Sequence, residues 1–206
     1  MRKRNNENVK EVINYCLQDE FDLADAEGRR LYLNGEIDEK VIDTLVYMIL
    51  EFNREDDGIP VEERKPIKIY INSPGGYVYD GFGLCSAIET SLTPIYTINQ
   101  ALCASMGFMV YIAGQKRFSM PYSIFLLHEG ETLDYGNTSK VEDRIEFEKE
   151  HLGKMIKDYV TSNTGINEEV YKRNYRREWY FLPKEGKEIG VVDYIVGEDC
   201  TMEDIL

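Results

Sequence analysis

The sequence predicts an α/β fold in a single domain, and two observations support this. From Arg30 onward, short runs of β-type residues alternate with helical patterns, which is typical of α/β proteins. The chain has 206 residues, enough to bury one core without requiring a second domain. We therefore expect an N-terminal segment at residues 1–29, followed by one domain at residues 30–206.

The first half of the expected domain contains three strands and two helices. Runs of β-type residues predict strands at 31–33, 67–71 and 95–98. Helical spacing of apolar residues predicts helices at 41–52 and 81–90. Residues 53–66 are rich in charge and contain Gly58, Pro60 and Pro66, so we expect a solvated loop there.

The second half contains an apolar run, a further strand and a long helix. The nearly apolar run 101–114 is too short to cross a bilayer and predicts a buried core helix. A strand is expected at 124–127. Apolar residues at intervals of three, four and seven predict a helix at about 140–161, with Ser139 and Glu142 as a capping box before it and Gly165 in the turn after it.

Charge and cysteine content narrow the class of protein. Lys and Arg total 24 and Asp and Glu total 38, so a net charge of -14 repels nucleic acid and anionic membrane surfaces. The basic start, residues 1–4, is followed by polar residues and does not resemble an export signal. Four cysteines without a C-x-x-C pair fit a reducing cytoplasm.

Three features of the sequence are compatible with catalysis. The loop 72–76 places Gly75 and Gly76 after a strand, where exposed N–H groups can form an anion cradle or simply an ordinary turn. Ser105 stands where a strand turns into the apolar run, a position that suits either a nucleophile or a plain helix N-cap. His128 ends an apolar strand and is the candidate base, because His151 lies on the polar side of the long helix.

The sequence carries no sign of a metal or nucleotide site. Two histidines without a C-x-x-C pair argue against a structural zinc site, and the H-E-x-x-H motif is absent. Both common phosphate-binding glycine spacings are absent as well. We therefore expect no metal and no cofactor.

Four segments together make the chain resemble the proteolytic subunit family of the ATP-dependent Clp protease, from about residue 30 to residue 195. In order, they are Ile-Asn-Ser-Pro-Gly-Gly at 71–76, Ala-Ser-Met-Gly at 104–107, Met-Pro-Tyr-Ser at 120–123 leading to His128, and Glu-Ile-Gly-Val-Val-Asp at 188–193. The resemblance implies a fold of the Clp protease and crotonase type, with repeated β-β-α units and a long helix-containing handle.

The resemblance also implies roles for individual residues. Ser105 falls on the family's nucleophile and His128 on its general base, while the backbone N–H groups of Gly76 and Met106 fall on its oxyanion hole. In such a site the imidazole takes the serine proton as the hydroxyl attacks a peptide carbonyl, and the two N–H groups stabilise the oxyanion.

This sequence departs from the family pattern at several places. The family's third triad residue, an aspartate, falls on Glu178, and Trp179 replaces the arginine that usually follows it. The glycine-rich strand after the histidine is replaced by residues 131–137, and two residues are missing in the turn 114–117. Subunits of the family usually assemble as two stacked rings. Because of these changes, the resemblance does not predict whether this chain forms the double ring.

The resemblance implies a cytoplasmic serine endopeptidase that cleaves unfolded polypeptides or peptides inside a homo-oligomeric ring. A separate AAA+ ATPase unfoldase would supply the substrate, because this chain has no nucleotide motif. A catalytically inactive scaffold subunit and a crotonase-type acyl-CoA enzyme are the alternatives. A thiol mechanism at Cys103 is the least favoured, because that residue precedes the helix start by two positions and would aim differently.

Overall fold

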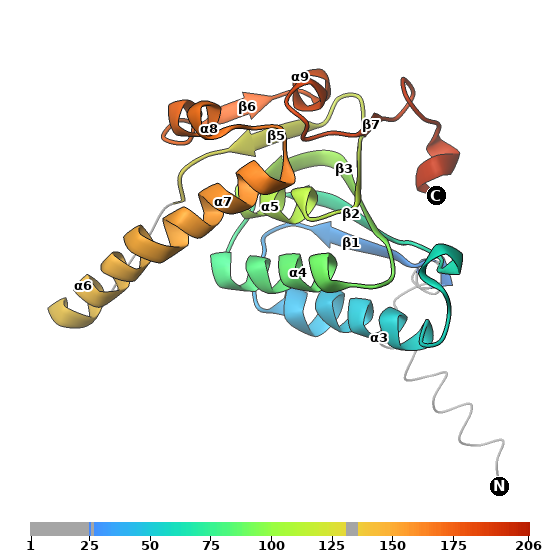
Figure 1. The fold of residues 1–206 in the computed structure, drawn as a ribbon, viewed down its shortest axis with the longest axis horizontal. Coiled ribbons are helices and arrows are strands. Elements are labelled where there is room, and N and C mark those ends of the chain that lie inside the picture. The colour runs from blue at the N-terminus through green and yellow to red at the C-terminus, as the bar shows by residue number, and fades with distance from the viewer. Residues whose placement is uncertain (1–24, 26, 131–135) are drawn as a thin grey trace, which may run out of the picture.

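The structure, a computed structural model, describes residues 25, 27–130 and 136–206 and has a β-sheet at its centre (Figure 1). The predicted N-terminal segment lies almost entirely outside these residues. The described part of the sheet has seven strands: β1 (Arg30–Asn34), β2 (Ile67–Ser73), β3 (Ile95–Ala104), β4 (Lys116–Ser119), β5 (Ile124–Leu127), β6 (Trp179–Phe181) and β7 (Tyr194–Ile195). The α/β prediction is confirmed.

The α-helices lie between the strands along the chain. In chain order, they are α3 (Tyr47–Glu55), α4 (Val78–Thr90), α5 (Met106–Ile112), α6 (Thr138–Phe147), α7 (Gly153–Asn163), α8 (Glu168–Asn174) and α9 (Pro183–Glu188). A π-helical turn, Ile42–Val46, precedes α3, and another, Glu148–Leu152, joins α6 to α7. Short 3-10 turns lie at Val61–Glu63 and Met202–Ile205. None of the helices in the described part of the chain is long and apolar enough to cross a membrane.

Strand β3 forks the sheet. Its first half, residues 96–99, pairs in parallel with β4, and its last residues, 102–104, pair in parallel with β5. Strand β5 in turn pairs antiparallel with β6, while β1 and β2 continue the parallel sheet on the other side of β3. The fork places the carboxyl ends of β3 and β5 side by side, which determines where the functional residues meet.

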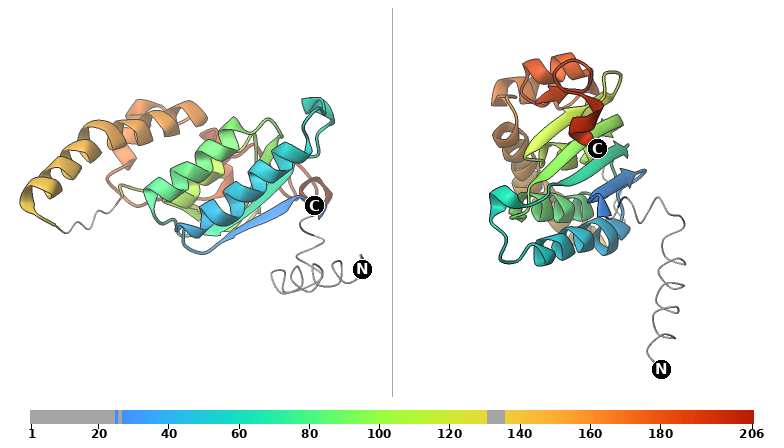
Figure 2. Two further views of the ribbon diagram at one scale, coloured as in Figure 1. Left: turned by 90° about the horizontal axis from the view of Figure 1, so that it is seen from below. Right: turned by 90° about the vertical axis from the view of Figure 1, so that its right-hand side faces the viewer.

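The core lies between the sheet and its helices. Helices α3 and α4 run side by side over one face of the sheet (Figure 2), and their residues Ile49, Phe52, Leu84 and Ile88 are buried there. All seven residues of α5 are buried, as the apolar run predicts. The helix begins later than that run does because β3 extends through Ala104.

Residues 138–163 form one long helical rod, which we call the handle. Its first part, α6, projects from the domain (Figure 1), and the end of α7 packs against the core, where Val160 is buried. The predicted helix is confirmed and extends from Thr138 to Asn163 through the π-helical turn. The predicted capping box is wrong: the helix starts one residue before Ser139, and its N-cap, Asn137, makes no side-chain cap hydrogen bond. Gly165 is not in a left-handed turn. Instead it allows close packing, since an added Cβ would lie 2.8 Å from the Ile189 carbonyl oxygen.

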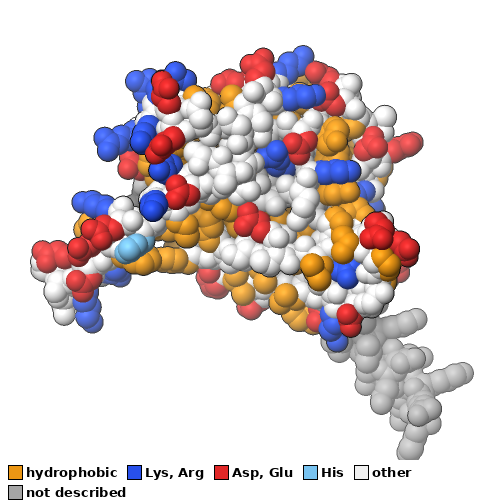
Figure 3. Space-filling model, in the orientation of Figure 1, with side chains coloured by type: hydrophobic (Ala, Val, Ile, Leu, Met, Phe, Trp, Pro, Cys, Tyr) orange, Lys and Arg blue, Asp and Glu red, His pale blue; other side chains and the backbone are white. Residues whose placement is uncertain are grey.

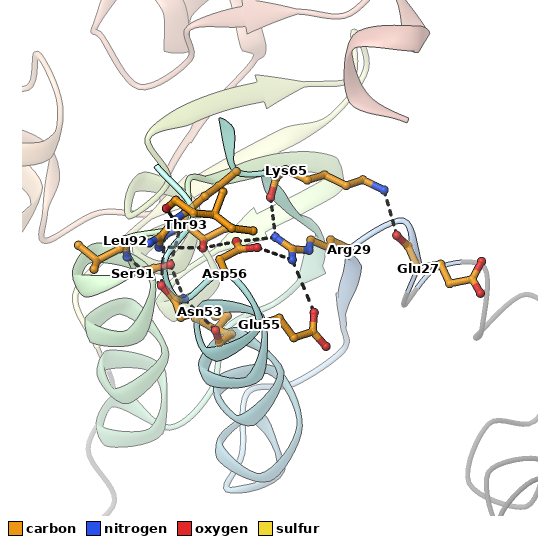
Figure 4. A network of polar contacts seen from close by, with 12 residues as sticks. Glu27, Arg29, Asn53, Glu55, Asp56, Lys65, Ser91, Leu92 and Thr93 are labelled. Atoms are coloured by element: carbon orange, nitrogen blue, oxygen red, sulfur yellow. Dashed lines mark hydrogen bonds and ion pairs between the residues drawn. The ribbon is translucent and has the colours of Figure 1, made fainter. Parts of the chain in front are cut away.

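A buried ion pair ties the start of β1 to the end of α3 (Figure 4). Arg29 donates to both carboxylate oxygens of Asp56, each at 2.7 Å, and the Thr93 hydroxyl donates to the same carboxylate at 2.6 Å. Asp56 is only 2% exposed. The prediction of a solvated loop from residue 53 onward is therefore wrong at its beginning, where α3 continues to Glu55 and Asp56 is buried.

Candidate active site

Ser105 occupies a strained turn between β3 and α5. Its backbone has φ 52° and ψ −120°, a region that residues other than glycine rarely adopt. Its N–H donates to the Leu126 carbonyl of β5 at 3.0 Å, and its own carbonyl accepts from the Phe108 N–H at 3.1 Å. A serine held in a sharp strand-to-helix turn is typical of a nucleophile elbow, because the turn presents the hydroxyl outside the sheet.

The side chain of Ser105 does not act as a helix cap. Although the residue occupies the N-cap position of α5, its hydroxyl makes no cap hydrogen bond. The residue is half-buried, so it is not enclosed in the core as its neighbours Ala104 and Met106 are. The structure therefore does not support the plain N-cap interpretation that the sequence had left open.

Gly75 brings the loop after β2 directly against the serine. A Cβ added at Gly75 would lie 2.7 Å from the Ser105 Cβ and 2.9 Å from the Met106 nitrogen, both closer than real contacts. Its φ of +100° also favours glycine. The glycine loop predicted from sequence thus lies beside Ser105 because it carries no side chain at this position.

Two backbone N–H groups near the serine remain available. The Met106 N–H has no intrahelical acceptor because Met106 is the first residue of α5. In the loop, the Gly75 carbonyl and the Tyr77 N–H bond to the backbone of Ile37 at 2.8 and 2.9 Å, whereas the Gly76 N–H donates no backbone bond within the described residues. These are the two groups that the family resemblance assigns to an oxyanion hole.

His128 and Glu178 are brought together by the pairing of β5 with β6. Leu127 pairs with Trp179, so the antiparallel register places the next residue, His128, opposite Glu178. The His128 Nδ1 lies 3.9 Å from the Glu178 Oε1, longer than a hydrogen bond. The histidine side chain is 22% exposed and the glutamate side chain 63% exposed. The sheet therefore orders all three residues along one edge: Ser105 after β3, His128 after β5 and Glu178 before β6.

Nearby charged groups that could compete for these positions are engaged elsewhere. The Asp193 carboxylate, which could otherwise orient His128 in place of Glu178, accepts hydrogen bonds from Arg117 at 2.8 and 2.9 Å. Lys172 pairs with Glu168 at 3.1 Å. Within the described residues Glu178 makes no ion pair with the neighbouring arginines, and its second oxygen accepts a hydrogen bond from Tyr180.

Comparison with known proteins places the chain in a family. The profile of the Clp protease family matches residues 21–199. This chain belongs to the Clp protease family. It is 31% identical over 173 residues to "ATP-dependent Clp protease proteolytic subunit 1" of Prochlorococcus marinus (strain MIT 9312), covering 82% of this chain and 84% of the relative. It is 29% identical to proteolytic subunit 3 of Synechococcus sp. (strain CC9605), covering 82% of each chain. It is 30% identical to proteolytic subunit 2 of Treponema denticola, covering 81% of each.

The fold of this Clp protease family member argues against a thiol nucleophile at Cys103. That side chain is fully buried in the core, and burial raises the pKa of its thiol well above the ordinary value. A protonated, inaccessible thiol is neither nucleophilic nor within reach of a substrate. The described residues also contain no group of three or more side chains suited to holding a metal ion.

Sequence reasoning missed one residue at this site, Tyr180. Its hydroxyl donates to the Glu178 Oε2 at 2.9 Å. The available signal was the spacing of two between Glu178 and Tyr180, because residues two apart on a strand share a face. The three-residue strand β6 was not recognised in the sequence, so that spacing had no structural meaning before the fold was known.

Proposed function

We propose that this Clp protease family member is a serine endopeptidase subunit, with Ser105 as nucleophile, His128 as general base and Glu178 as the carboxylate that orients the histidine. The observation that carries the proposal is the strained backbone of Ser105, at the end of β3 and beside the end of β5, where His128 follows. Strain of this kind costs free energy and persists where function requires it.

The proposed reaction follows from these positions. The His128 imidazole takes the Ser105 proton as the hydroxyl oxygen attacks a peptide carbonyl. The N–H groups of Gly76 and Met106 then stabilise the oxyanion, and one such donor supplies about 3 kcal/mol in other enzymes. The imidazolium next protonates the leaving amine. Water, activated by the same histidine, hydrolyses the acyl-enzyme and frees the serine.

Glu178 must move slightly to complete this arrangement. At 3.9 Å from the His128 Nδ1 its carboxylate is beyond hydrogen-bond length, and hydrogen bonds of catalytic groups are often longer without substrate than with it. Its exposed side chain has room to rotate toward the imidazole. In the contracted arrangement the carboxylate would accept a hydrogen bond from the His128 Nδ1–H, which leaves Nε2 free to act as base.

The proposal extends to assembly and partners. We place the active site inside a homo-oligomeric ring that receives unfolded polypeptide from an AAA+ ATPase. The support is the family and the printed names of the relatives, which describe proteolytic subunits of an ATP-dependent protease. An enclosed site would protect folded proteins from an otherwise unselective peptidase.

Labelling with a fluorophosphonate, followed by peptide mapping, tests the proposed chemistry. The wild-type chain should carry the adduct on Ser105, and both Ser105→Ala and His128→Gln should abolish labelling while leaving the circular dichroism spectrum unchanged. Ser86→Ala, which removes an exposed hydroxyl on α4, is the control and should label normally. An adduct on another serine would contradict the assignment. A folded wild-type chain that takes no label would support the inactive scaffold instead.

A further inference from the structure

A glutamate at the third triad position raises a problem that an aspartate would not. Glu178 has an additional rotatable bond, and its side chain is 63% exposed, so a free carboxylate there would sample many rotamers. Holding it toward His128 costs conformational entropy that nothing in the backbone offsets. An orienting carboxylate at this position therefore needs a second contact.

Tyr180 supplies that contact. Its hydroxyl donates to the Glu178 Oε2 at 2.9 Å, while the Oε1 of the same carboxylate is the atom nearest the His128 Nδ1. The backbone of the tyrosine is fixed by its pairing with Leu126 in the ladder between β5 and β6, while its side chain is 55% exposed. The carboxylate thus lies between the Tyr180 phenol and the imidazole.

Within the described residues, the ion-pair contact given for His128 is with the Glu178 carboxylate. Glu129 follows the histidine in the chain, and its charge acts on Tyr171 and Tyr175 at α8, where burial is the main cause that raises the pKa of both phenols and the Glu129 charge adds to it. The hydrogen bond to Glu178 raises the pKa of Tyr180, so this phenol remains a donor at neutral pH.

We infer that Tyr180 is a positioning residue, which holds the Glu178 carboxylate beside His128 and acts on catalysis only through it. The inference rests on the proposed function, in which Glu178 orients the histidine. It assigns the tyrosine a role in selecting one rotamer of a glutamate that would otherwise point into solvent.

A double-mutant cycle on the labelling rate tests this inference. Tyr180→Phe should slow fluorophosphonate labelling of Ser105 roughly three- to ten-fold, about the value of one net hydrogen bond. In a Glu178→Gln background the same substitution should have no further effect, because the tyrosine then has no carboxylate to hold. Tyr122→Phe, at an exposed tyrosine that is 92% accessible, is the matched control and should label like the wild type.

The tautomer of the His128 imidazole supplies a readout that a merely structural role would not change. A carboxylate held at Nδ1 selects the neutral tautomer that carries its proton on Nδ1, so releasing Glu178 should give a mixture of the two tautomers. The chain has two histidines, so the nitrogen chemical shifts of the His128 imidazole can be followed by NMR, with His151→Gln identifying the other signal. Tyr180→Phe should lower the fraction of His128 with its proton on Nδ1, and Glu178→Gln should lower it at least as far.

Three results would overturn the inference. Additive losses in the cycle would mean that Tyr180 acts on folding and not through Glu178. Faster labelling of Tyr180→Phe would mean that the tyrosine competes with His128 for the carboxylate. An unchanged His128 tautomer in Tyr180→Phe would mean that no positioning occurs. The NMR measurement needs no activity, so if wild-type Ser105 takes no label the proposed function fails while the imidazole signal still decides the role of Tyr180.

Discussion

At the scale of single residues, replacing the Glu178 carboxylate tests directly whether it orients His128. We predict that Glu178→Gln lowers the turnover of a peptide substrate by orders of magnitude, up to the ~10⁴-fold loss seen when an orienting carboxylate is replaced by an amide. The amide cannot stabilise the imidazolium and favours the wrong tautomer. Steady-state kinetics would measure the effect.

The neighbouring glutamate is the control for this prediction. Glu129→Gln removes a charge of the same sign from the residue next to His128, and it should change turnover less than a fewfold. If Glu178→Gln also stayed within a fewfold of the wild type, Ser105 and His128 would act as a dyad and Glu178 would be a surface residue.

A methyl group at Gly75 should displace Ser105, the proposed nucleophile. The Cβ of alanine would collide with the Ser105 Cβ at 2.7 Å and with the Ala104 carbonyl oxygen at 2.9 Å, so the strained turn must shift. We predict that Gly75→Ala abolishes fluorophosphonate labelling. Gly58→Ala is the matched control, because Gly58 also has a positive φ, of +81°, but has open space around it. The control should lose some stability and still label. Normal labelling of Gly75→Ala would show that the contact is not needed.

The catalytic candidates could be located from the sequence, but their geometry could not. The motifs around Ser105 and His128, with the family resemblance, predicted which residues to examine. The strained φ of Ser105 depends on its bond to Leu126, and the approach of Glu178 depends on the register of β5 with β6, both contacts between distant parts of the chain. No local pattern encodes either contact.

At the scale of secondary-structure elements, the pair of Arg29 and Asp56 joins the start of β1 to the end of α3 (Figure 4). The hydrogen bonds from Arg29 and Thr93 hold the pKa of the Asp56 carboxyl below its usual value, against the opposing effect of burial. Removing one partner of a buried pair leaves the other uncompensated. We predict that Asp56→Asn lowers the free energy of unfolding at pH 7 by about 3 kcal/mol.

The same pair predicts how this difference varies with pH. Because the folded-state pKa of Asp56 is depressed, its contribution is fully present above the unfolded pKa of about 3.9 and is lost as the pH falls through the folded value. Urea unfolding should therefore show the wild type and Asp56→Asn converging below about pH 4. Asp57→Asn, at the exposed next residue, should match the wild type throughout. A difference for Asp56→Asn that persisted undiminished in acid would mean that packing, not charge, produces the effect.

Long, periodic elements were predictable, while short or interrupted ones were not. The handle was recognised because its apolar spacing persists over many residues. Strands β6 and β7 were missed because they have only three and two residues, and β4 was missed because its first two residues, Lys116 and Arg117, are charged. Each of the three pairs with a strand distant in the sequence. The burial of Asp56 was missed for a related reason, since its arginine partner lies 27 residues away and a charged residue after a helix normally faces solvent.

At the scale of the whole molecule, the first part of the handle stands out from the rest of the domain (Figure 1). Its outer end carries interspersed acidic and basic side chains (Figure 3). Apolar residues are exposed along it as well: Ile145 is 37% exposed, Phe147 49% and Met155 45%. Exposed apolar side chains on a projecting helix are typical of a surface that becomes covered on assembly.

We predict that the chain forms a ring-shaped homo-oligomer at micromolar concentration, as a peptidase with an enclosed site requires. Native mass spectrometry and sedimentation velocity would measure the assembly, with fluorophosphonate labelling reporting the active serine in the same sample.

If two rings stack through their handles, replacing Ile145 and Phe147 together by serine should convert the larger species to one of half the mass and leave the ring itself intact. The same substitutions should not unfold the domain, because both side chains lie on the exposed end of the handle, away from the core. A monomer across the micromolar range would contradict the enclosed site, even if Ser105 took the label.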